Sequence, residues 1–261
     1  MAEKMKRLNR TSRRNFTTYG VVILAYVILQ FLGSDVLKQG GVLSFTIQGM
    51  LVPICAYIVM AVSLNLTVGI LGELSLGHAG FMSMGAFTGT AAAMALQDAI
   101  PSAPLRLAVA MVIGAAFAAL AGFLIGIPVL RLNGDYLAIV TLAFGEIIKS
   151  IFNNLYVGVD SSGLHMSLLS DKTDLAEGGK LLISGPMGIG GIQKISTFTA
   201  GFLLVMITLA VVFNLVNSRA GRAIMAIRDN RIAAESVGIP VTKYKMIAFV
   251  TSAALAGASG A

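Results

Sequence analysis

Apolar residues gather in seven runs along the chain, and each run has about the length that a helix needs to cross a bilayer. A helix of about 20 residues spans a hydrocarbon core that is about 30 Å thick. The runs cover residues 17–32, 43–70, 79–96, 107–130, 136–155, 197–216 and 246–261. This pattern predicts an all-α polytopic membrane protein with at least seven spans. Because the seventh run is still apolar at its last residue, we expect an incomplete span and a longer parent polypeptide.

The second run is longer than a straight crossing requires, at 28 residues. It contains Pro53, which cannot donate a backbone hydrogen bond, and it ends near Gly69. We therefore expect this segment to tilt, to kink at Pro53, or to break near Gly69.

The composition excludes soluble enzyme folds, since 56% of the residues are hydrophobic and only 12% are charged. In soluble domains about a quarter of all residues are charged. A single cysteine, Cys55, allows neither an intrachain disulfide nor a cysteine-based metal cluster. The net charge of +7 could indicate a nucleic-acid partner, but the basic residues lie beside apolar runs. Membrane orientation explains them more simply, and we expect no nucleic acid and no metal site.

The basic residues also predict the sidedness of the chain, because loops in the cytoplasm carry the excess of lysine and arginine. With the N-terminus inside, 13 of the 19 lysines and arginines lie on the inner side and five on the outer side, with Lys149 within the fifth run. We therefore expect residues 1–16 to be a basic cytoplasmic N-terminus. Residues 157–196 form an external loop in this topology, and residues 218–245 lie in the cytoplasm.

Small residues recur every four positions in the fourth run, and a shorter set lies in the third. On a helix such residues form one flat stripe that lets another backbone approach closely. They predict a tightly packed helical bundle rather than a ligand site. The residues are Gly114, Ala118, Gly122 and Gly126 in the fourth run, and Gly85 and Gly89 in the third.

Residues 69–80 interrupt the apolar pattern with four glycines, Glu73, Ser75 and His78. One interpretation is a cytoplasmic turn in which these side chains are solvated. The other is a broken or re-entrant helix beside a translocation path, because irregular backbone at membrane depth persists only where protein or water surrounds it. Both interpretations stay open, and in the second one Glu73, Ser75 and His78 line the path.

Glu146 and Lys149 lie three positions apart in the fifth run, on one helical face and close enough to pair. Ionisable groups inside a span are costly and usually face an interior or a pathway. A structural ion pair is the favoured interpretation. Lys149 can instead extend toward the outer surface. The alternative is that Glu146 lies on the translocation path.

The cytoplasmic stretch 218–245 predicts a short helix over residues 220–228 and a second one capped by Asp229 or Asn230. Gly238 and Pro240 are expected to end the second helix. Such a charged loop is usually only solvated. A further hypothesis is that Ile224, Ile227 and Ile232 form an apolar face that docks into a groove of a soluble partner. The two arginines at positions 228 and 231 would fall in the same arc and weaken that face.

Three motifs in chain order resemble the permeases of branched-chain amino acid ABC transporters, LivM subgroup. The first is Leu-Asn-Leu-Thr-Val-Gly at 64–69, which leads into Gly-Glu-Leu-Ser-Leu-Gly-His-Ala-Gly-Phe at 72–81. The second is Leu-Arg-Leu-Asn-Gly-Asp-Tyr-Leu-Ala-Ile-Val-Thr-Leu at 130–142, and the third is Ile-Ala-Ala-Glu-Ser-Val-Gly-Ile at 232–239. The resemblance covers residues from about 60 to 261 and implies that residues 17–261 form an importer's transmembrane domain.

The resemblance also implies that Ala233, Ala234 and Gly238 belong to the coupling loop that contacts the ATP-hydrolysing subunits. In the general form of that loop a glutamate precedes the two alanines, whereas this chain has Ile232 there and its acid at Glu235. The implied partners are ATP-binding cassette subunits, a second permease subunit and an extracytoplasmic substrate-binding protein. The implied location is the bacterial cytoplasmic membrane.

The chain contains no phosphate-binding loop for ATP, since Gly178-Gly179-Lys180 is followed by leucine and lacks the upstream glycine. We therefore expect a transport subunit that is not an enzyme, needs no cofactor and depends on a separate ATPase. A urea or short-amide importer is the alternative within this class. An ion-coupled secondary transporter that uses Glu73 or Glu146 as its coupling carboxylate is the alternative from a different class.

Overall fold

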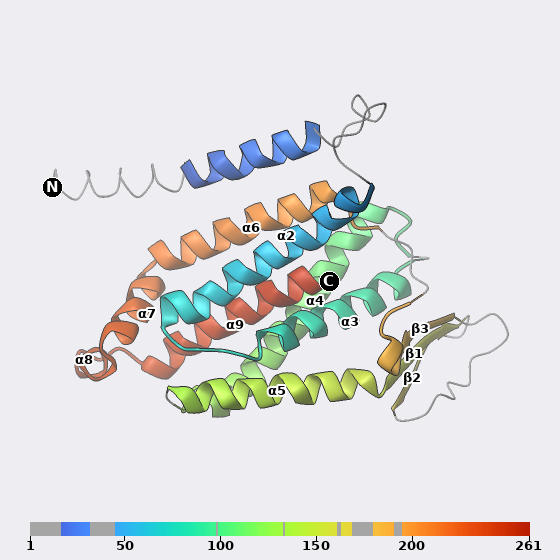
Figure 1. Ribbon diagram of the computed structural model, residues 1–261. Coiled ribbons are helices and arrows are strands. Elements are labelled where there is room, and N and C mark those ends of the chain that lie inside the picture. Colours follow the sequence, from blue (N-terminus) through green and yellow to red (C-terminus); the bar gives the residue numbers. More distant parts are fainter. Residues whose placement is uncertain are drawn as a thin grey trace.

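The computed structural model describes residues 17–31, 45–97, 99–132, 134–160, 163–168, 180–190 and 195–261. Most of these residues form a bundle of long helices, with a small sheet at one end (Figure 1). The helices are Thr17–Phe31, α2 (Phe45–Asn65), η2 (Leu66–Leu71), α3 (His78–Ala95), α4 (Ala103–Val129), α5 (Asp135–Asn153), α6 (Phe198–Asn217), α7 (Arg219–Asp229), α8 (Arg231–Ser236) and α9 (Val241–Gly260). The basic segment 1–16 lies outside the described residues.

The centre of the bundle is formed by α3, α4 and α9, which pack against one another, while α2 packs on α9 and α6 covers α2. Helix α5 lies along α3 at the edge of the bundle (Figure 1). The largest apolar cluster joins the central helices through residues such as Phe81, Ala118, Phe249 and Ala253. At the opposite edge, Cys55 and Val59 of α2 pack against Val205 of α6.

Within the described part of the chain, four helices are long and apolar enough to cross a membrane: Gly49–Leu71, Ala103–Val129, Tyr136–Asn153 and Phe198–Asn217. The helix Thr17–Phe31 is apolar but shorter. Helices α3 and α9 correspond to the third and seventh predicted spans but carry more polar residues, among them His78 and Lys245. Eleven of the 20 residues of α9 are buried. Protein surrounds much of α9, which explains how it can carry polar residues.

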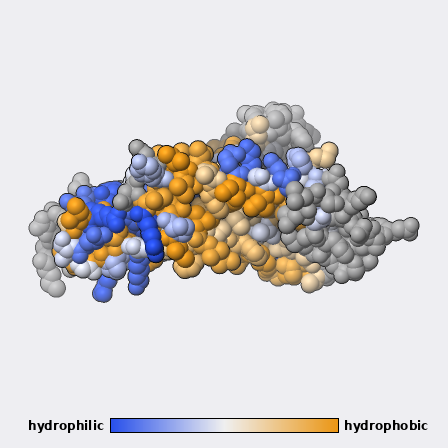
Figure 2. All heavy atoms as spheres, turned by 90° about the horizontal axis from the view of Figure 1, so that it is seen from below, coloured by the Kyte–Doolittle hydropathy of each residue, from blue (hydrophilic) through white to orange (hydrophobic). Residues whose placement is uncertain are grey.

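The outer surface of the bundle is apolar over its middle part. Hydrophobic residues cover much of the middle of the face in Figure 2, whereas hydrophilic residues gather at the end that carries α7 and α8. Large side chains such as Val112, Leu120 and Leu124 of α4 are more than half exposed. A water-soluble protein rarely exposes such a broad apolar surface. The described helices therefore form a polytopic membrane protein.

The stripe of small residues in α4 is a buried helix contact, as predicted from the sequence. All four stripe positions are buried. A Cβ atom added to Gly122 would lie 2.7 Å from the Cβ of Ala253 in α9, and one added to Gly126 would lie 2.7 Å from the Sδ of Met246. The absent side chains let α4 and α9 approach closely, and Gly85 and Gly89 bring α3 against the end of α9 in the same way.

The segment after α5 departs from the predicted all-α fold, because it contains three strands. They are β1 (Leu155–Asp160), β2 (Gly163–Leu168) and β3 (Lys180–Ser184), and they form an antiparallel sheet in the order β2-β1-β3. Leu155 and Val157 of β1 are buried against Phe87 and Phe152. An apolar residue at every second position is typical of a half-buried strand. The alternation covers only a few residues and begins where the apolar run 136–155 ends. The sequence pattern therefore did not indicate a sheet.

The long second run changes its helical form at Leu66 rather than at Pro53. Helix α2 continues through Pro53 to Asn65, and the next six residues form a π-helix, η2, that contains Gly69. Gly72 ends η2 with a φ of +80°, a backbone conformation that side chains strongly disfavour. The predicted break near Gly69 is observed, whereas α2 is not interrupted at Pro53 and the tilt stays a prediction.

Candidate functional site

The segment between η2 and α3 is non-helical over residues 72–77, with Ser75 and Gly77 buried and Gly72, Leu74 and Leu76 exposed. Two hydrogen bonds fix its course: Glu73 N donates to Thr67 O at 3.1 Å, and Leu76 N donates to the Oγ1 of Thr141 in α5 at 3.1 Å. Gly77 lies directly against the Thr141 carbonyl, where a Cβ atom would clash. Irregular backbone at this position is therefore held by neighbouring helices on several sides.

Glu73 forms an ion pair with Lys245 at the first turns of α9. The side chains are only 13% and 5% exposed, respectively. The second carboxylate oxygen of Glu73 is buried and has no hydrogen-bond partner among the described residues, and the same is true of the Ser75 hydroxyl. This pair joins two parts of the chain that are 172 residues apart.

His78 begins α3 and meets a cluster of hydroxyl groups from α2 and α9. The Ser63 hydroxyl donates to Met60 O and the Ser252 hydroxyl donates to Ser63 O, each at 2.7 Å. Both hydroxyl protons are thereby used, and Thr67 Oγ1 donates its own to Ser252 Oγ at 3.0 Å. His78 Nε2 lies 3.0 Å from Ser63 Oγ and 3.2 Å from Ser252 Oγ.

These hydrogen bonds determine the tautomer of the imidazole. The two hydroxyl oxygens can only accept from His78, so the proton resides on Nε2, which shares it between them. Nδ1 is then an acceptor, and it is buried without a partner within the described chain. His78 as a whole is 3% exposed. The cluster ties α2, α3 and α9 together at one level of the bundle.

Ser75 and His78 are buried and Glu73 is largely so, which contradicts the solvation of these side chains that the turn interpretation expected. The observed backbone, in which η2, a non-helical stretch and α3 follow one another, fits both a turn and a broken helix, so the choice between them stays open. Whether the three side chains line a translocation path stays a prediction.

Glu146 lies apart from this buried cluster. It pairs with Lys149 at 3.2 Å, as the spacing predicted, and the two side chains are 64% and 65% exposed. Both lie at a groove of about 300 Å³ between α3 and α5, across from Gly77 and Gly80. The ion-pair interpretation is confirmed, and a place for Glu146 on a translocation path stays a prediction.

Helices α7 and α8 follow the predicted boundaries closely. The Asn230 side chain accepts a hydrogen bond from Ala233 N at 3.0 Å and caps α8. After α8, Gly238 has a φ of +82°, Gly238 N donates to Glu235 O, and Ile239 N donates to Ala234 O. This pair of hydrogen bonds is the Schellman ending of a helix, in which glycine is strongly preferred.

The predicted docking face of three isoleucines is wrong, because the chain turns at Asn230. Ile224 and Ile227 face inward: the first packs with Leu71 and Ala248, and the second packs with Ala234 and Val241. Ile232 instead lies on α8 and is 76% exposed. A periodicity of 3.6 residues holds only within one continuous helix, so the break at Asn230 places Ile232 on a different surface.

The predicted coupling residues divide by exposure. Ala234 is buried against Ile227, whereas Ala233 and Gly238 are exposed. Glu235 is exposed and pairs with Arg231 at 3.2 Å, one turn earlier. The open surface around α8 includes Ala233, Gly238 and the apolar side chains of Ile232 and Val237, beside the exposed Arg231–Glu235 pair.

Arg228 connects α7 to the polar segment described above. Its Nη1 donates to Gly69 O at 3.0 Å, while Nε and Nη2 donate to Asp229 Oδ1. The side chain of Arg228 also lies against Gly72, where a Cβ atom would come within 2.5 Å of Arg228 Cγ. Together with Lys245, Arg228 places the loop 218–245 in direct contact with η2 and Glu73.

Several residues of this arrangement were not singled out from the sequence. Ser63 and Ser252 lie in apolar runs without a recognisable motif, Lys245 entered only the topology count, and Arg228 was noted only as a topology signal and as a charge that weakens the isoleucine face. Their partners in other elements lie 15 to 189 residues away along the chain. Glu73, in contrast, was visible as an acid among glycines in an otherwise apolar stretch.

A polytopic helical bundle with a buried polar segment and a basic loop at one end is the architecture of a membrane transport protein. The family described as "Branched-chain amino acid transport system / permease component" matches residues 46–261. The chain belongs to this family of permease components.

The chain is also similar to two curated relatives, each named "High-affinity branched-chain amino acid transport system permease protein LivM". The relative from Salmonella typhimurium is 36% identical over 218 residues, which are 78% of this chain and 49% of the relative. The relative from Escherichia coli strain K12 is 36% identical over 214 residues, with the same two shares. The chain thus spans about half the length of these relatives. No solved structure matches it.

Proposed function

We propose that the chain is the membrane permease subunit of an ATP-driven importer for branched-chain amino acids in the bacterial cytoplasmic membrane. The family match over residues 46–261 and the two LivM relatives support this proposal. The importer would also contain ATP-binding cassette subunits, a second permease subunit and an extracytoplasmic binding protein. In this assembly the helix Thr17–Phe31, α3 and α9 act as spans in addition to the four long apolar helices.

In the proposed topology α7 and α8 face the cytoplasm and the sheet faces outward. The two ends of the bundle in Figure 1 carry these elements, with α7 and α8 at one end and β1–β3 at the other. The charge distribution along the sequence supports the same assignment.

The coupling proposal rests on one observation. The surface of α8 is exposed, and the loop 218–245 that contains it contacts the bundle through Arg228 and Lys245. Ile232 and Val237 are 76% and 75% exposed, at the end of the molecule where the basic residues gather. Exposed apolar side chains of this kind favour a protein contact. An ATP-binding subunit that docks on α8 would push on α7, and Arg228 and Lys245 would pass the motion to η2 and Glu73.

The test uses Gly238→Phe in the reconstituted importer. The position has open space, with nothing within 4 Å of an added Cβ atom, so the side chain would project into the proposed docking surface. We expect uptake and stimulated ATP hydrolysis to fall together, about tenfold or more, while the binding protein keeps its affinity for substrate.

Gly134→Phe is the matched control, because Gly134 also has a positive φ, of 60°, and open space around it. It also places a large side chain at a positive-φ position but lies outside the loop, so both activities should stay close to those of the unmodified importer. If Gly238→Phe reduced uptake while ATP hydrolysis still responded fully to the loaded binding protein, α8 would not be the coupling element.

Two further measurements separate the alternatives. Uptake that survives an uncoupler but stops when the ATP-binding subunit is inactivated supports the ATP-driven importer, whereas the opposite result supports an ion-coupled transporter that uses Glu73 or Glu146. Competition between labelled leucine and an excess of urea or a short amide distinguishes the two substrate classes.

A further inference from the structure

The helix η2 is a six-residue π-helix that continues the α-helix α2. Gly72 N donates to Thr67 O, five residues earlier, whereas an α-helix joins residues that are four apart. Glu73 N donates to the same carbonyl oxygen at 3.1 Å. A π turn of this kind holds one residue more than the α-helical turn it replaces, and such single turns often occur at functional sites. The end of η2 therefore contains one spare residue of chain.

Contacts from α7 and α9 hold this turn in place. Arg228 of α7 donates to Gly69 O, inside η2, at 3.0 Å. Leu71 is buried in a cluster with Ile224 of α7 and Ala248 of α9. Closing the turn as an α-helix would rotate Leu71 by about 100° about the helix axis, because one residue of an α-helix corresponds to that angle. The π form of η2 thus depends on the position of α7.

The segment 72–77 that follows η2 is fixed at its far end and can take up chain at its near end. Leu76 N donates to Thr141 Oγ1 of α5, and Gly77 lies against the Thr141 carbonyl. At the near end, Gly72 is exposed and has a φ of +80°. A residue released from η2 would enter the segment at Gly72 and lengthen it by up to about 3.3 Å.

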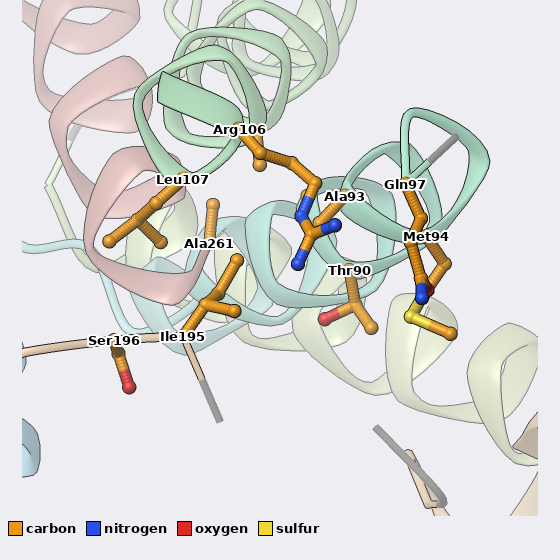
Figure 3. A pocket seen from close by; sticks show the side chains of 11 residues that line it. Thr90, Ala93, Met94, Gln97, Arg106, Leu107, Ile195, Ser196 and Ala261 are labelled. Carbon is orange, nitrogen blue, oxygen red and sulfur yellow. The ribbon is translucent and has the colours of Figure 1, made fainter. Parts of the chain in front are cut away.

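The polar side chains of residues 73–78 lack part of their hydrogen bonds in the observed arrangement. Glu73 Oε2, Ser75 Oγ and His78 Nδ1 are buried without a hydrogen-bond partner among the described residues. The one other such atom in the described part of the chain is Arg106 Nε, on a side chain that extends from α4 toward α3 (Figure 3). Buried polar groups normally have partners, because leaving one unpaired costs free energy. Three such atoms directly after a π turn are expected of a segment that has a second arrangement.

We propose that η2 is a two-state switch, which stores one residue in its π form and releases it into the segment 72–77 when α7 moves. In the second state the turn closes as an α-helix, the bond from Arg228 to Gly69 O is lost, and the segment gains the freedom to move against α9. Movement of α7 would then reach Glu73 through a change of helix form rather than through rigid displacement. This inference rests on the proposed importer function and adds to it the element that changes shape.

Deletion of Val68 removes the spare residue and tests the switch in the importer reconstituted with its other subunits. The turn should close as an α-helix while Leu71 and Glu73 keep their places. The thermal unfolding midpoint in detergent should therefore stay close to that of the unmodified protein. Uptake and stimulated ATP hydrolysis should nevertheless fall about tenfold, a size typical of a lost coupling between two sites.

Deletion of Val62, in the regular part of α2, is the matched control. It turns Ser63 and the following residues up to η2 by about 100° away from their partners, so it should reduce the yield of folded importer. Normal uptake after deletion of Val68 would overturn the switch, since the spare residue would be dispensable. A yield as low as that of the Val62 deletion would also overturn it, because η2 would then have no residue to release. An unmodified importer that carried no branched-chain amino acid would instead refute the proposed function.

A disulfide between η2 and α7 reports the form of the turn separately from transport. A Cβ atom added to Gly72 would lie 3.5 Å from Arg228 Cβ, a separation at which a disulfide forms. The variant combines Gly72→Cys and Arg228→Cys in a Cys55→Ser background, and the packing of Leu71 keeps η2 joined to α7. It is oxidised mildly in the importer without nucleotide and in the importer held with ATP bound by an inactive ATP-binding subunit.

We expect the disulfide yields in the two nucleotide states to differ several-fold, because residue 72 rotates when the turn closes. With Val68 also deleted, the two yields should be equal. Equal yields without the deletion would contradict the switch. A difference that persisted after the deletion would contradict it as well, since α7 would then move against η2 as a rigid body.

Discussion

Two pairs of lysine and glutamate in the described part of the chain are chemically alike and have opposite surroundings. Glu146 and Lys149 lie on one face of α5, three residues apart, with side chains about two thirds exposed. Glu73 and Lys245 come from distant parts of the sequence and are almost fully buried where the polar segment meets α9. The exposed pair has alternatives to its partner at the protein surface, whereas each member of the buried pair depends on the other.

This difference shows which of the two pairs can hold the structure in one arrangement. A buried ion pair often stabilises no more than apolar residues of the same shape would, but removal of one partner leaves an uncompensated charge. The Glu73–Lys245 pair therefore fixes one arrangement of the segment 72–77 relative to α9. It also lies beside Arg228 and the loop 218–245, which is where a coupled motion must enter the bundle in the proposed importer.

The largest effect is expected for Lys245→Met, which leaves the Glu73 carboxylate buried without its cation. Loss of one partner of a buried pair costs about 3–5 kcal/mol. The thermal unfolding midpoint of the purified protein in detergent should fall clearly. The double variant Glu73→Lys with Lys245→Glu restores opposite charges and should recover part of the loss. A midpoint for Lys245→Met equal to that of the unmodified protein would show that the pair is not essential.

An intermediate effect is expected for Arg228→Met, because this side chain is 41% exposed and makes one hydrogen bond across elements, to Gly69 O. Loss of that bond should cost about 1 kcal/mol. Stimulated ATP hydrolysis should fall more than the thermal midpoint does, since Arg228 joins α7 to η2. Arg222→Met serves as the control, because Arg222 Nη1 donates to Asn217 O at the end of α6 and makes no hydrogen bond to η2. Equal effects of the two variants on ATP hydrolysis would refute a special role for Arg228.

The smallest effect is expected for Glu146→Gln. Lys149 lies one turn before the end of α5 and can extend toward the surface when it loses its partner, so the thermal midpoint should hardly change. Uptake is the more informative measurement, because Glu146 is also a candidate for the translocation path and for ion coupling. Unchanged uptake would remove Glu146 from both roles, and a large loss with normal stability would place it on the path.

The sequence predicted those features that depend on residues close together in the chain. The small-residue stripe of α4, the Asn230 cap and the Gly238 ending each follow from local backbone geometry or from one helical period. The ion pair of Glu146 with Lys149 belongs to the same class. The coarse order of the helices also followed, because apolar runs of about 20 residues have few alternatives in a membrane protein.

The features that depend on tertiary packing could not be derived from the sequence. The pairing of Glu73 with Lys245 and the contacts of His78 with Ser63 and Ser252 require the positions of three helices. The prediction of a three-isoleucine face was wrong for a related reason. The helix breaks at Asn230, so Ile232 lies on a different helix and a different surface.

The most direct test of the coupling role of α8 is site-specific photocrosslinking in the intact importer. A photoreactive residue at Ala233, on the exposed surface of α8, should form an adduct with the ATP-binding subunit. The same residue at Met187, which is 88% exposed beside the sheet, should form none with that subunit. Reaction of the ATP-binding subunit with position 187, or its failure to react with position 233 in an importer that is active, would contradict the proposed orientation and the coupling role of α8.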